Sequence, residues 1–165
     1  MYSLNITMAT FTHVGFIRHD DYMTPKYAWE NIQEYIPKDK VIWECFMGDG
    51  KSGQYLEELG FDVIHNDNDF FQSDEGDIVV SNPPFSKAKD VITRLKELDK
   101  PFILILPSSK INTQYFRLFK NQIQIIIPRN RIQFVKNGNE LQNSCNFDCF
   151  YYCYKMNMKK DITWL

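Results

Sequence analysis

Short apolar runs recur along the chain and are separated by stretches of mixed polarity. Runs of about four to eight apolar residues between turn residues are typical of buried strands. We expect one strand to begin at residue 41, and others to cover about 61–65, 77–81, 102–107, 122–127 and 147–155. The run 102–107 is apolar throughout, which is the pattern of a strand buried on both faces of a parallel sheet.

Between these runs, apolar residues fall at helical spacing. Four helices are predicted, each with a start or stop signal: Thr24 and Pro25 open one that ends at Pro37, Gly60 closes one over about 51–59, Ser86 caps one carrying Ala88 to Leu98, and Ser108-Ser109 cap one carrying Tyr115, Phe116 and Phe119. Strands and helices that alternate in this way predict an α/β fold with a mainly parallel central sheet, helices on both faces and an antiparallel last strand.

Length and composition indicate one domain able to bury a sizeable core, because the chain has 165 residues, of which 44% are hydrophobic and 15% aromatic. Residues 1–21 show no clear period and are interpreted as an N-terminal segment or flap, and 22–165 as the folded domain. The chain has neither a long apolar span nor a secretory signal pattern, so we expect a soluble, cytoplasmic protein without membrane partners.

Cysteine and histidine positions favour neither disulfides nor a metal. Three of the four cysteines, Cys145, Cys149 and Cys153, recur every fourth residue, which does not match the unequal spacing of a three-cysteine iron–sulfur site. Positions four apart share one face of a strand, so these residues are predicted to be small buried thiols. The triplet 19–21 contains histidine and aspartate, but adjacent side chains diverge, and no metal site is expected.

The net charge of −2 and the pI of about 5.9 give no bulk attraction to nucleic acid. One local basic segment, 128–138, lies between two apolar runs and contains Arg129, Arg131 and Lys136. We predict that these three side chains meet phosphate groups, although a solvated charged loop would have the same composition.

The most informative motif is Asn82-Pro83-Pro84-Phe85, which directly follows the run 77–81. Two prolines must end the strand and stiffen the loop, and the carboxyl end of a parallel strand is where open α/β sheets place their chemistry. The loop offers an amide side chain, a carbonyl and an aromatic face, which together suit a planar amine. A proline-terminated strand without any chemistry is the alternative interpretation.

This motif resembles the Asn-Pro-Pro-Phe/Tyr motif of S-adenosylmethionine-dependent amino methyltransferases that modify the exocyclic nitrogen of adenine, and the chain looks most like the small phage and viral members. The resemblance implies a Rossmann-like methyltransferase fold. It also implies that the Asn82 side-chain oxygen and the Pro83 carbonyl accept both amine hydrogens, and that Phe85 stacks on the base. Pro84 would complete the rigid catalytic loop.

The resemblance extends to an S-adenosylmethionine site. Tyr22, Thr24 and Pro25 match a turn that borders the methionine moiety, whereas Glu44, Phe46, Gly48 and Gly50 match the glycine-loop signature, with Cys45 in place of its usual proline. Asp67 is the expected ribose ligand at the end of the second strand. Asp69 and Phe70 resemble the adenine-contacting motif, but they follow so closely that the third strand of the fold is expected to be missing or minimal.

The implied reaction is methyl transfer to N6 of adenine in nucleic acid, with DNA favoured over RNA. Methylation of RNA or of a protein glutamine amide, or a catalytically idle binding subunit, are the alternatives. The motifs use nearly all of the chain and leave no separate target-recognition domain. We therefore expect weak sequence preference with strong salt dependence, or specificity gained from a homodimer or an accessory subunit.

Overall fold

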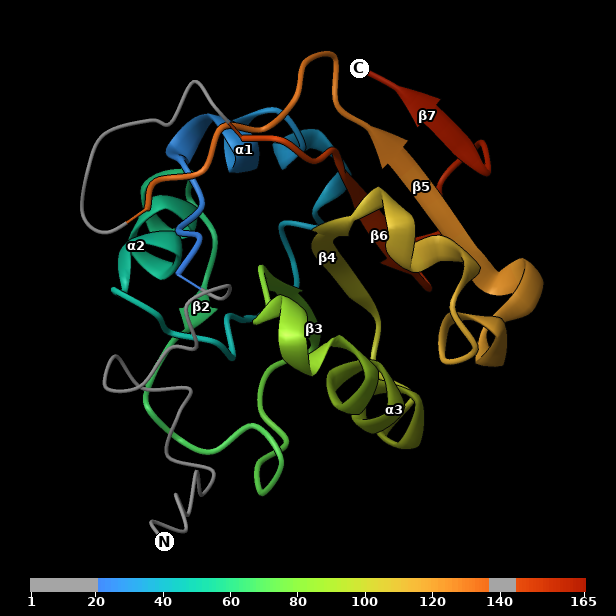
Figure 1. The fold of residues 1–165 in the computed structure, drawn as a ribbon. Coiled ribbons are helices and arrows are strands. Elements are labelled where there is room, and N and C mark those ends of the chain that lie inside the picture. The colour runs from blue at the N-terminus through green and yellow to red at the C-terminus, as the bar shows by residue number, and fades with distance from the viewer. Residues whose placement is uncertain (1–20, 137–144) are drawn as a thin grey trace, which may run out of the picture.

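A seven-stranded sheet forms the centre of the computed structural model, which describes residues 21–136 and 145–165. Along the sheet the strands are β2 (Val63–Ile64), β1 (Ile42–Trp43), β3 (Ile78–Ser81), β4 (Phe102–Pro107), β6 (Cys149–Tyr154), β5 (Ile123–Ile127) and β7 (Ile162–Trp164), as Figure 1 shows. The first four run parallel, and β6 runs antiparallel to both β4 and β5. The predicted α/β fold with its mainly parallel sheet is therefore confirmed.

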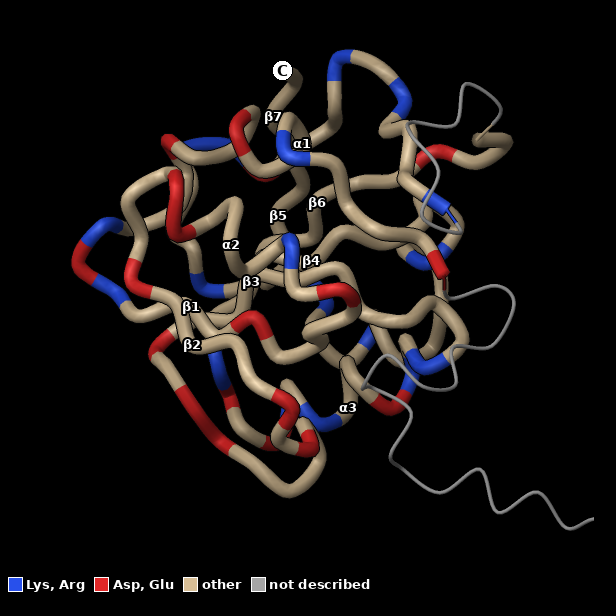
Figure 2. The backbone as a smooth tube through the Cα atoms, turned by 90° about the vertical axis from the view of Figure 1, so that its left-hand side faces the viewer, with Lys and Arg blue, Asp and Glu red and all other residues tan. Residues whose placement is uncertain are grey.

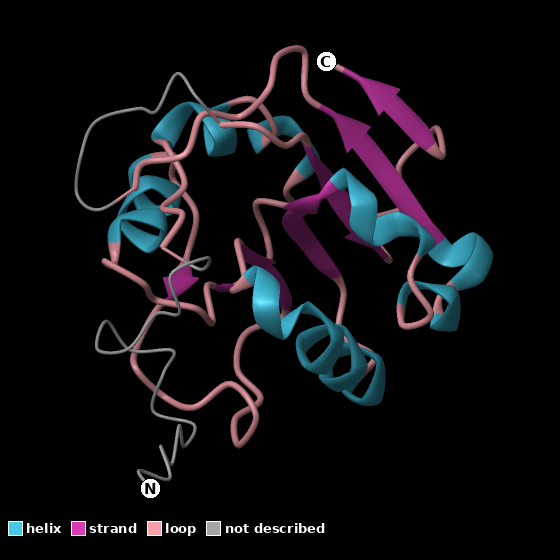
Figure 3. Cartoon of the chain, viewed as in Figure 1, coloured by secondary structure: helices cyan, strands magenta, loops and turns pink. Residues whose placement is uncertain are grey.

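Each face of the sheet carries its own apolar core. Side chains alternate across a strand, so Ile103 and Ile105 of β4 face one core while Phe102, Leu104 and Leu106 face the other. The helices α1 (Lys26–Glu30) and α2 (Lys51–Glu58) cover the first face, and α3 (Ala88–Leu98) covers the second, as the cartoon in Figure 3 shows. Because β4 is covered on both faces and paired along both edges, its uniformly apolar sequence is explained.

Two predicted helix caps are wrong. The N-cap residue of α1 is Pro25 and no side chain caps the helix, so Thr24 does not act as the cap. α1 is also short, and a 3-10 turn at Gln33–Tyr35 follows it. α3 is preceded by the 3-10 turn Phe85–Lys87, which makes Lys87 its N-cap in place of Ser86. The stiff prolines before Phe85 leave the chain extended at Pro84, and a tight 3-10 turn is needed before the helix can begin.

The helix predicted after Ser108-Ser109 is replaced by three 3-10 turns, at Ser108–Asn112, Phe116–Leu118 and Lys120–Gln122. The chain is extended at Thr113 and left-handed at Lys120, and both conformations interrupt a continuous helix. The short turns still bring Phe116 and Phe119 onto the sheet, where both are buried. Their burial therefore stabilises this segment without a regular helix.

The cofactor half of the sheet is truncated. Residues 65–77 contain no strand, so β2 forms one edge of the sheet, and the expected loss of the third strand is confirmed. The opposite edge is β7, a strand that was not predicted. The antiparallel strand is therefore β6, and contrary to expectation it is not the last strand of the chain. A three-residue strand whose residues Ile162 and Trp164 are exposed shows too little of the buried-strand pattern to be predicted.

All four cysteines are free, and Cys149 and Cys153 are buried on β6 as predicted, whereas Cys145 precedes the strand and is half-buried. In the part of the chain that the structure describes, no helix combines the length and apolarity needed to cross a membrane. The N-terminal segment 1–21 lies outside the described residues, apart from Asp21.

Candidate active site

One pocket opens at the carboxyl ends of β1 and β3, between the two loops that the sequence motifs predicted. Nine predicted site residues line it: Tyr22, Thr24, Glu44, Phe46, Gly48, Asn82, Pro83, Pro84 and Phe85. Four further lining residues were not among the predicted site residues: Met23, Met47, Asp49 and Ser52. The strands β1 and β3 are neighbours in the sheet, which is why loops 35 residues apart along the chain meet. The site therefore follows directly from the sheet topology.

The amide of Asn82 has one free acceptor. Its Nδ2 donates to the backbone carbonyl of Tyr22 at 2.7 Å, whereas its Oδ1 is buried without a hydrogen-bond partner among the described residues. Since a buried unpaired acceptor costs about 1–3 kcal/mol, the site holds this oxygen in an unfavourable state. A ligand N–H group that reached Oδ1 would recover that cost.

Phe85 lies in a cluster of four aromatic rings. Tyr22 stacks on it with a centroid distance of 5.7 Å and an interplanar angle of 20°. Phe134 and Phe147 meet its edge at 6.1 Å and 5.6 Å. No sequence motif marks Phe134 and Phe147, because their segments approach the Asn82–Phe85 loop only in the folded chain. Tyr22 and Phe85 line the pocket together with Asn82, and the buried Phe134 supports them from the protein interior.

Glu44 is a buried acid at the end of β1, with only 1% of its surface exposed. Its Oε1 accepts a hydrogen bond from the Ser81 hydroxyl and another from the Phe46 backbone N–H, the latter at 3.1 Å. Burial raises the pKa of the carboxyl to about 8, while these two hydrogen bonds act in the opposite direction. Glu44 is therefore mainly protonated at neutral pH.

The glycine loop needs both of its glycines. Gly48 has φ of +54° and Gly50 of +79°, in the left-handed region that other residues rarely adopt. Met23 and Met47 lie over them, with the sulfur of Met23 at 3.1 Å from the position a Cβ would take on Gly48. These two side chains narrow the pocket. Methionine side chains are flexible, so they are able to turn aside for a larger ligand.

The acidic residues after β2 are not brought into the pocket. Asp67 is exposed, and Asp69 accepts a hydrogen bond from the backbone N–H of Phe71 at 2.9 Å. Phe70 is fully buried between Trp43 and Phe46, with ring centroids at 5.4 Å and 4.9 Å. It therefore supports the wall of the pocket from behind.

The pocket lining also excludes two of the predicted cofactor positions, Pro25 and Gly50. Pro25 is buried directly behind the lining residue Thr24, and Gly50 forms the turn that leads into α2. In the structure both residues therefore shape their loops, and their contact with the cofactor stays a prediction.

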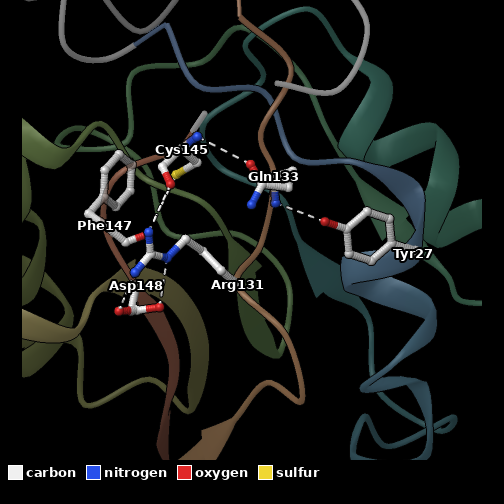
Figure 4. Close-up of polar contacts among 6 residues, drawn as sticks. All are labelled: Tyr27, Arg131, Gln133, Cys145, Phe147 and Asp148. Atoms are coloured by element: carbon white, nitrogen blue, oxygen red, sulfur yellow. Dashed lines mark hydrogen bonds and ion pairs between the residues drawn. The ribbon is translucent and has the colours of Figure 1, made fainter. Parts of the chain in front are cut away.

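The three predicted phosphate contacts lie in different surroundings. Arg131 forms a two-point ion pair with Asp148, at 2.9 Å and 3.0 Å, and donates to the carbonyl of Cys145, as Figure 4 shows. Cys145 N–H in turn donates to the Gln133 side chain, so the two chain segments are fastened together. Because these partners occupy its guanidinium, Arg131 mainly links its own segment to residues 145–148.

Arg129 is exposed, whereas Lys136 lies 4.6 Å from the centre of the Tyr22 ring. Figure 2 shows acidic and basic positions interspersed along the chain, with several acidic positions around β1 and β2. Lys136 is thus the one of the three predicted cations that the structure places against a residue of the pocket.

The parallel sheet, the glycine turn and the pocket at its carboxyl edge define an α/β fold of the methyltransferase type. The sequence profile of the family described as adenine-specific methyltransferase EcoRI matches residues 47–148, which is more than half of the chain. The chain therefore belongs to this family of adenine-specific methyltransferases. The matched range contains the second half of the glycine loop and all of Asn82-Pro83-Pro84-Phe85.

No curated protein matches the chain. Among solved structures, a candidate RNA methyltransferase from Pyrococcus horikoshii is similar over 89% of this chain and 96% of its own, with 15% sequence identity and a TM-score of 0.46.

Proposed function

We propose that the protein transfers a methyl group from S-adenosylmethionine to the exocyclic N6 of adenine in nucleic acid, with DNA favoured over RNA. The observation that carries the proposal is the buried Oδ1 of Asn82, which has no hydrogen-bond partner in the described part of the chain; Asn82 lines the pocket together with Phe85. An adenine amine supplies the N–H donor that this oxygen lacks, and Phe85 supplies a face for the base. The family match supports adenine as the target.

Asn82 would act on the amine through geometry. Its Nδ2 is fixed on Tyr22, so its Oδ1 is the atom that remains for an N6 hydrogen. Accepting hydrogen bonds from the amine draws the nitrogen lone pair out of conjugation with the ring and toward the methyl donor. The buried Pro83 and Pro84 keep the loop from relaxing. No strong general base is required for the attack, because the donor is already activated: the C–S bond breaks as the C–N bond forms, the positive charge passes from sulfur to N6, and the methylated amine then loses a proton to solvent.

The cofactor residues fit a methyl donor with a cationic amino-acid end. Among the described lining residues, Glu44 and Asp49 are the only carboxylic acids, and the lining has no lysine or arginine. Thr24 adds a hydroxyl that is 4% exposed and lacks a partner within the described chain. When bound, S-adenosylmethionine supplies an activated methyl group, and these polar groups would hold its methionine part. Asp67 remains the proposed ribose ligand and Asp69 a proposed adenine contact, whereas Phe70, which is fully buried, would act on the cofactor site through Phe46.

A nucleobase is preferred over a glutamine amide because of the aromatic cluster. Tyr22 and Phe85 line the pocket with Asn82, and Phe134 and Phe147 support them; a stacking contact contributes about 1–3 kcal/mol per base. A glutamine side chain would use the hydrogen-bonding groups but little of this surface. Adenine presents the same edge in DNA and in RNA, so both nucleic acids have to be tested.

The deciding experiment measures transfer of tritiated methyl groups to adenine-containing DNA, to RNA and to a protein substrate. We expect label on N6 of adenine with the wild-type protein, and transfer reduced by at least 10²-fold in Asn82→Ala. Cofactor affinity of this variant, measured by calorimetry, should stay within a few-fold of wild type. Asn121→Ala, at an exposed asparagine outside the pocket, is the matched control. Loss of cofactor binding together with activity would show that Asn82 is structural, and label confined to protein would refute the nucleic-acid substrate.

A further inference from the structure

The carboxyl of Glu44 is buried in the pocket, and no cation among residues 21–136 and 145–165 forms an ion pair with it. Its hydrogen bonds come from the neutral hydroxyl of Ser81 and from the backbone N–H of Phe46. Burial is the largest influence on its pKa and raises it. A buried carboxylate that lacks a cation is costly, so the group keeps its proton instead.

The ionisable groups facing Glu44 from the surrounding elements do not change this. Cys45 follows it on the same chain segment, and burial raises the pKa of that thiol well above its usual value, so it stays neutral. Tyr22 and Asp49 line the same pocket from the two neighbouring loops. The charge of Lys100 reaches Cys45 weakly, but its ammonium is engaged by Asp74 and by the carbonyls of Glu75 and Gly76.

We propose that Glu44 is neutral in the free protein and ionises when the cationic end of S-adenosylmethionine enters, so that binding of the cofactor releases a proton. The inference deepens the proposed function and rests on it. The O–H bond of the carboxyl breaks, its proton passes to solvent, and the carboxylate then faces the positive charge of the ligand. No other bond changes, and no further reactant is needed.

A second group in the pocket independently points to a ligand at this place. The hydroxyl of Thr24 is buried and unpaired within the described residues, and Thr24 lines the same pocket as Glu44. The Thr24 hydroxyl has no partner among the described residues, and the Glu44 carboxyl has only uncharged ones; such a pair matches a ligand with several N–H donors and a positive charge. The ammonium group of a methionine moiety has both properties.

Isothermal titration calorimetry of the full chain with S-adenosylmethionine at pH 6.5 would test the proposal, in two buffers of different ionisation enthalpy. We expect about one proton released per cofactor bound by the wild type, and affinity that rises by up to tenfold per pH unit between pH 6 and 7. Glu44→Gln should release almost no proton and lose this pH dependence. The glutamine oxygen is able to accept both hydrogen bonds, and circular dichroism would confirm that the variant is folded.

Glu30→Gln is the matched control, because Glu30 is an exposed glutamate outside the pocket. It should release the proton as the wild type does. S-adenosylhomocysteine keeps the ammonium group and lacks the sulfonium charge, so it identifies the cation that Glu44 meets. If both ligands cause equal proton release, that cation is the ammonium group. Tight binding without proton release by the wild type would overturn the inference while leaving the proposed function intact. Absence of any binding would instead contradict the proposed function.

Discussion

Replacing Glu44 by glutamine should change how the stability of the ligand-free protein depends on pH. The folded-state pKa of Glu44 is about 8 against an ordinary value of 4.5. A raised acid pKa means that the folded protein binds more protons than the unfolded chain between these two values. The contribution of Glu44 to the free energy of unfolding is therefore most favourable at low pH. It falls as pH rises through this window and levels off above about pH 8.

The expected magnitude follows from the width of the window. Each pH unit within it costs about 1.4 kcal/mol, so the wild type should lose about 3 kcal/mol between pH 5 and pH 7 through this one group. That is a large fraction of the 5–15 kcal/mol typical of a folded domain. Glu44→Gln cannot ionise and should lose none of it.

Urea unfolding at pH 5, 6 and 7, followed by circular dichroism, would measure this difference. Other groups titrate as well, including Asp148, whose pKa is lowered by its bond to Arg131. Subtracting the curves of wild type and Glu44→Gln removes such contributions, and Glu30→Gln should run parallel to the wild type. If wild type and Glu44→Gln kept a constant difference across the range, Glu44 would be ionised in the folded protein and the reasoning would be wrong.

Three further predictions concern the remaining parts of the site. Phe85→Ala should weaken engagement of a target base by about 1–3 kcal/mol because one stacking face is lost, and unchanged methylation at low substrate concentration would contradict this. Asp67→Ala should weaken cofactor binding more than Asp69→Ala, since the Asp69 carboxylate already holds the backbone of Phe71; the opposite order in titrations would show a shifted register. Methylation mapped on random-sequence substrate should reveal weak sequence preference with strong salt dependence. If the preference is strong instead, light scattering should detect a dimer or the activity should require a second subunit. A strict monomer that methylates one long unique sequence would exclude both.

The sequence predicted the parts of the fold that depend on burial along a single segment. The run 102–107 and the spacing of Val91, Ile92 and Leu95 each report one strongly buried surface, and both elements were located correctly. The predicted caps Thr24 and Ser86 were wrong. Pro25 directly follows Thr24 and is itself the N-cap, whereas Pro84 precedes a 3-10 turn that contains Ser86. The fixed φ of proline therefore shaped the chain before both helices.

For the site, motif residues on β1 and β3 were brought together because the order of parallel strands makes those loops neighbours. Phe134 and Phe147 could not be found in the same way. Both lie in irregular segments that flank residues 137–144. The pairing of Met23 with Val135 and of Arg131 with Asp148 holds these segments where the two rings contact Phe85. Such contacts depend on folded distances that no local pattern encodes.

The hydrogen bond from the Asn82 amide to the Tyr22 carbonyl also restricts which amino acid is allowed at position 82. Aspartate has nearly the same shape as asparagine, yet it would place a carboxylate oxygen against a carbonyl oxygen at the distance of a hydrogen bond, and the two would repel. The main chain at Tyr22 therefore selects an amide over an acid sixty residues away. Anyone redesigning the acceptor specificity of this enzyme would have to alter the backbone of the 22–25 turn together with the catalytic side chain.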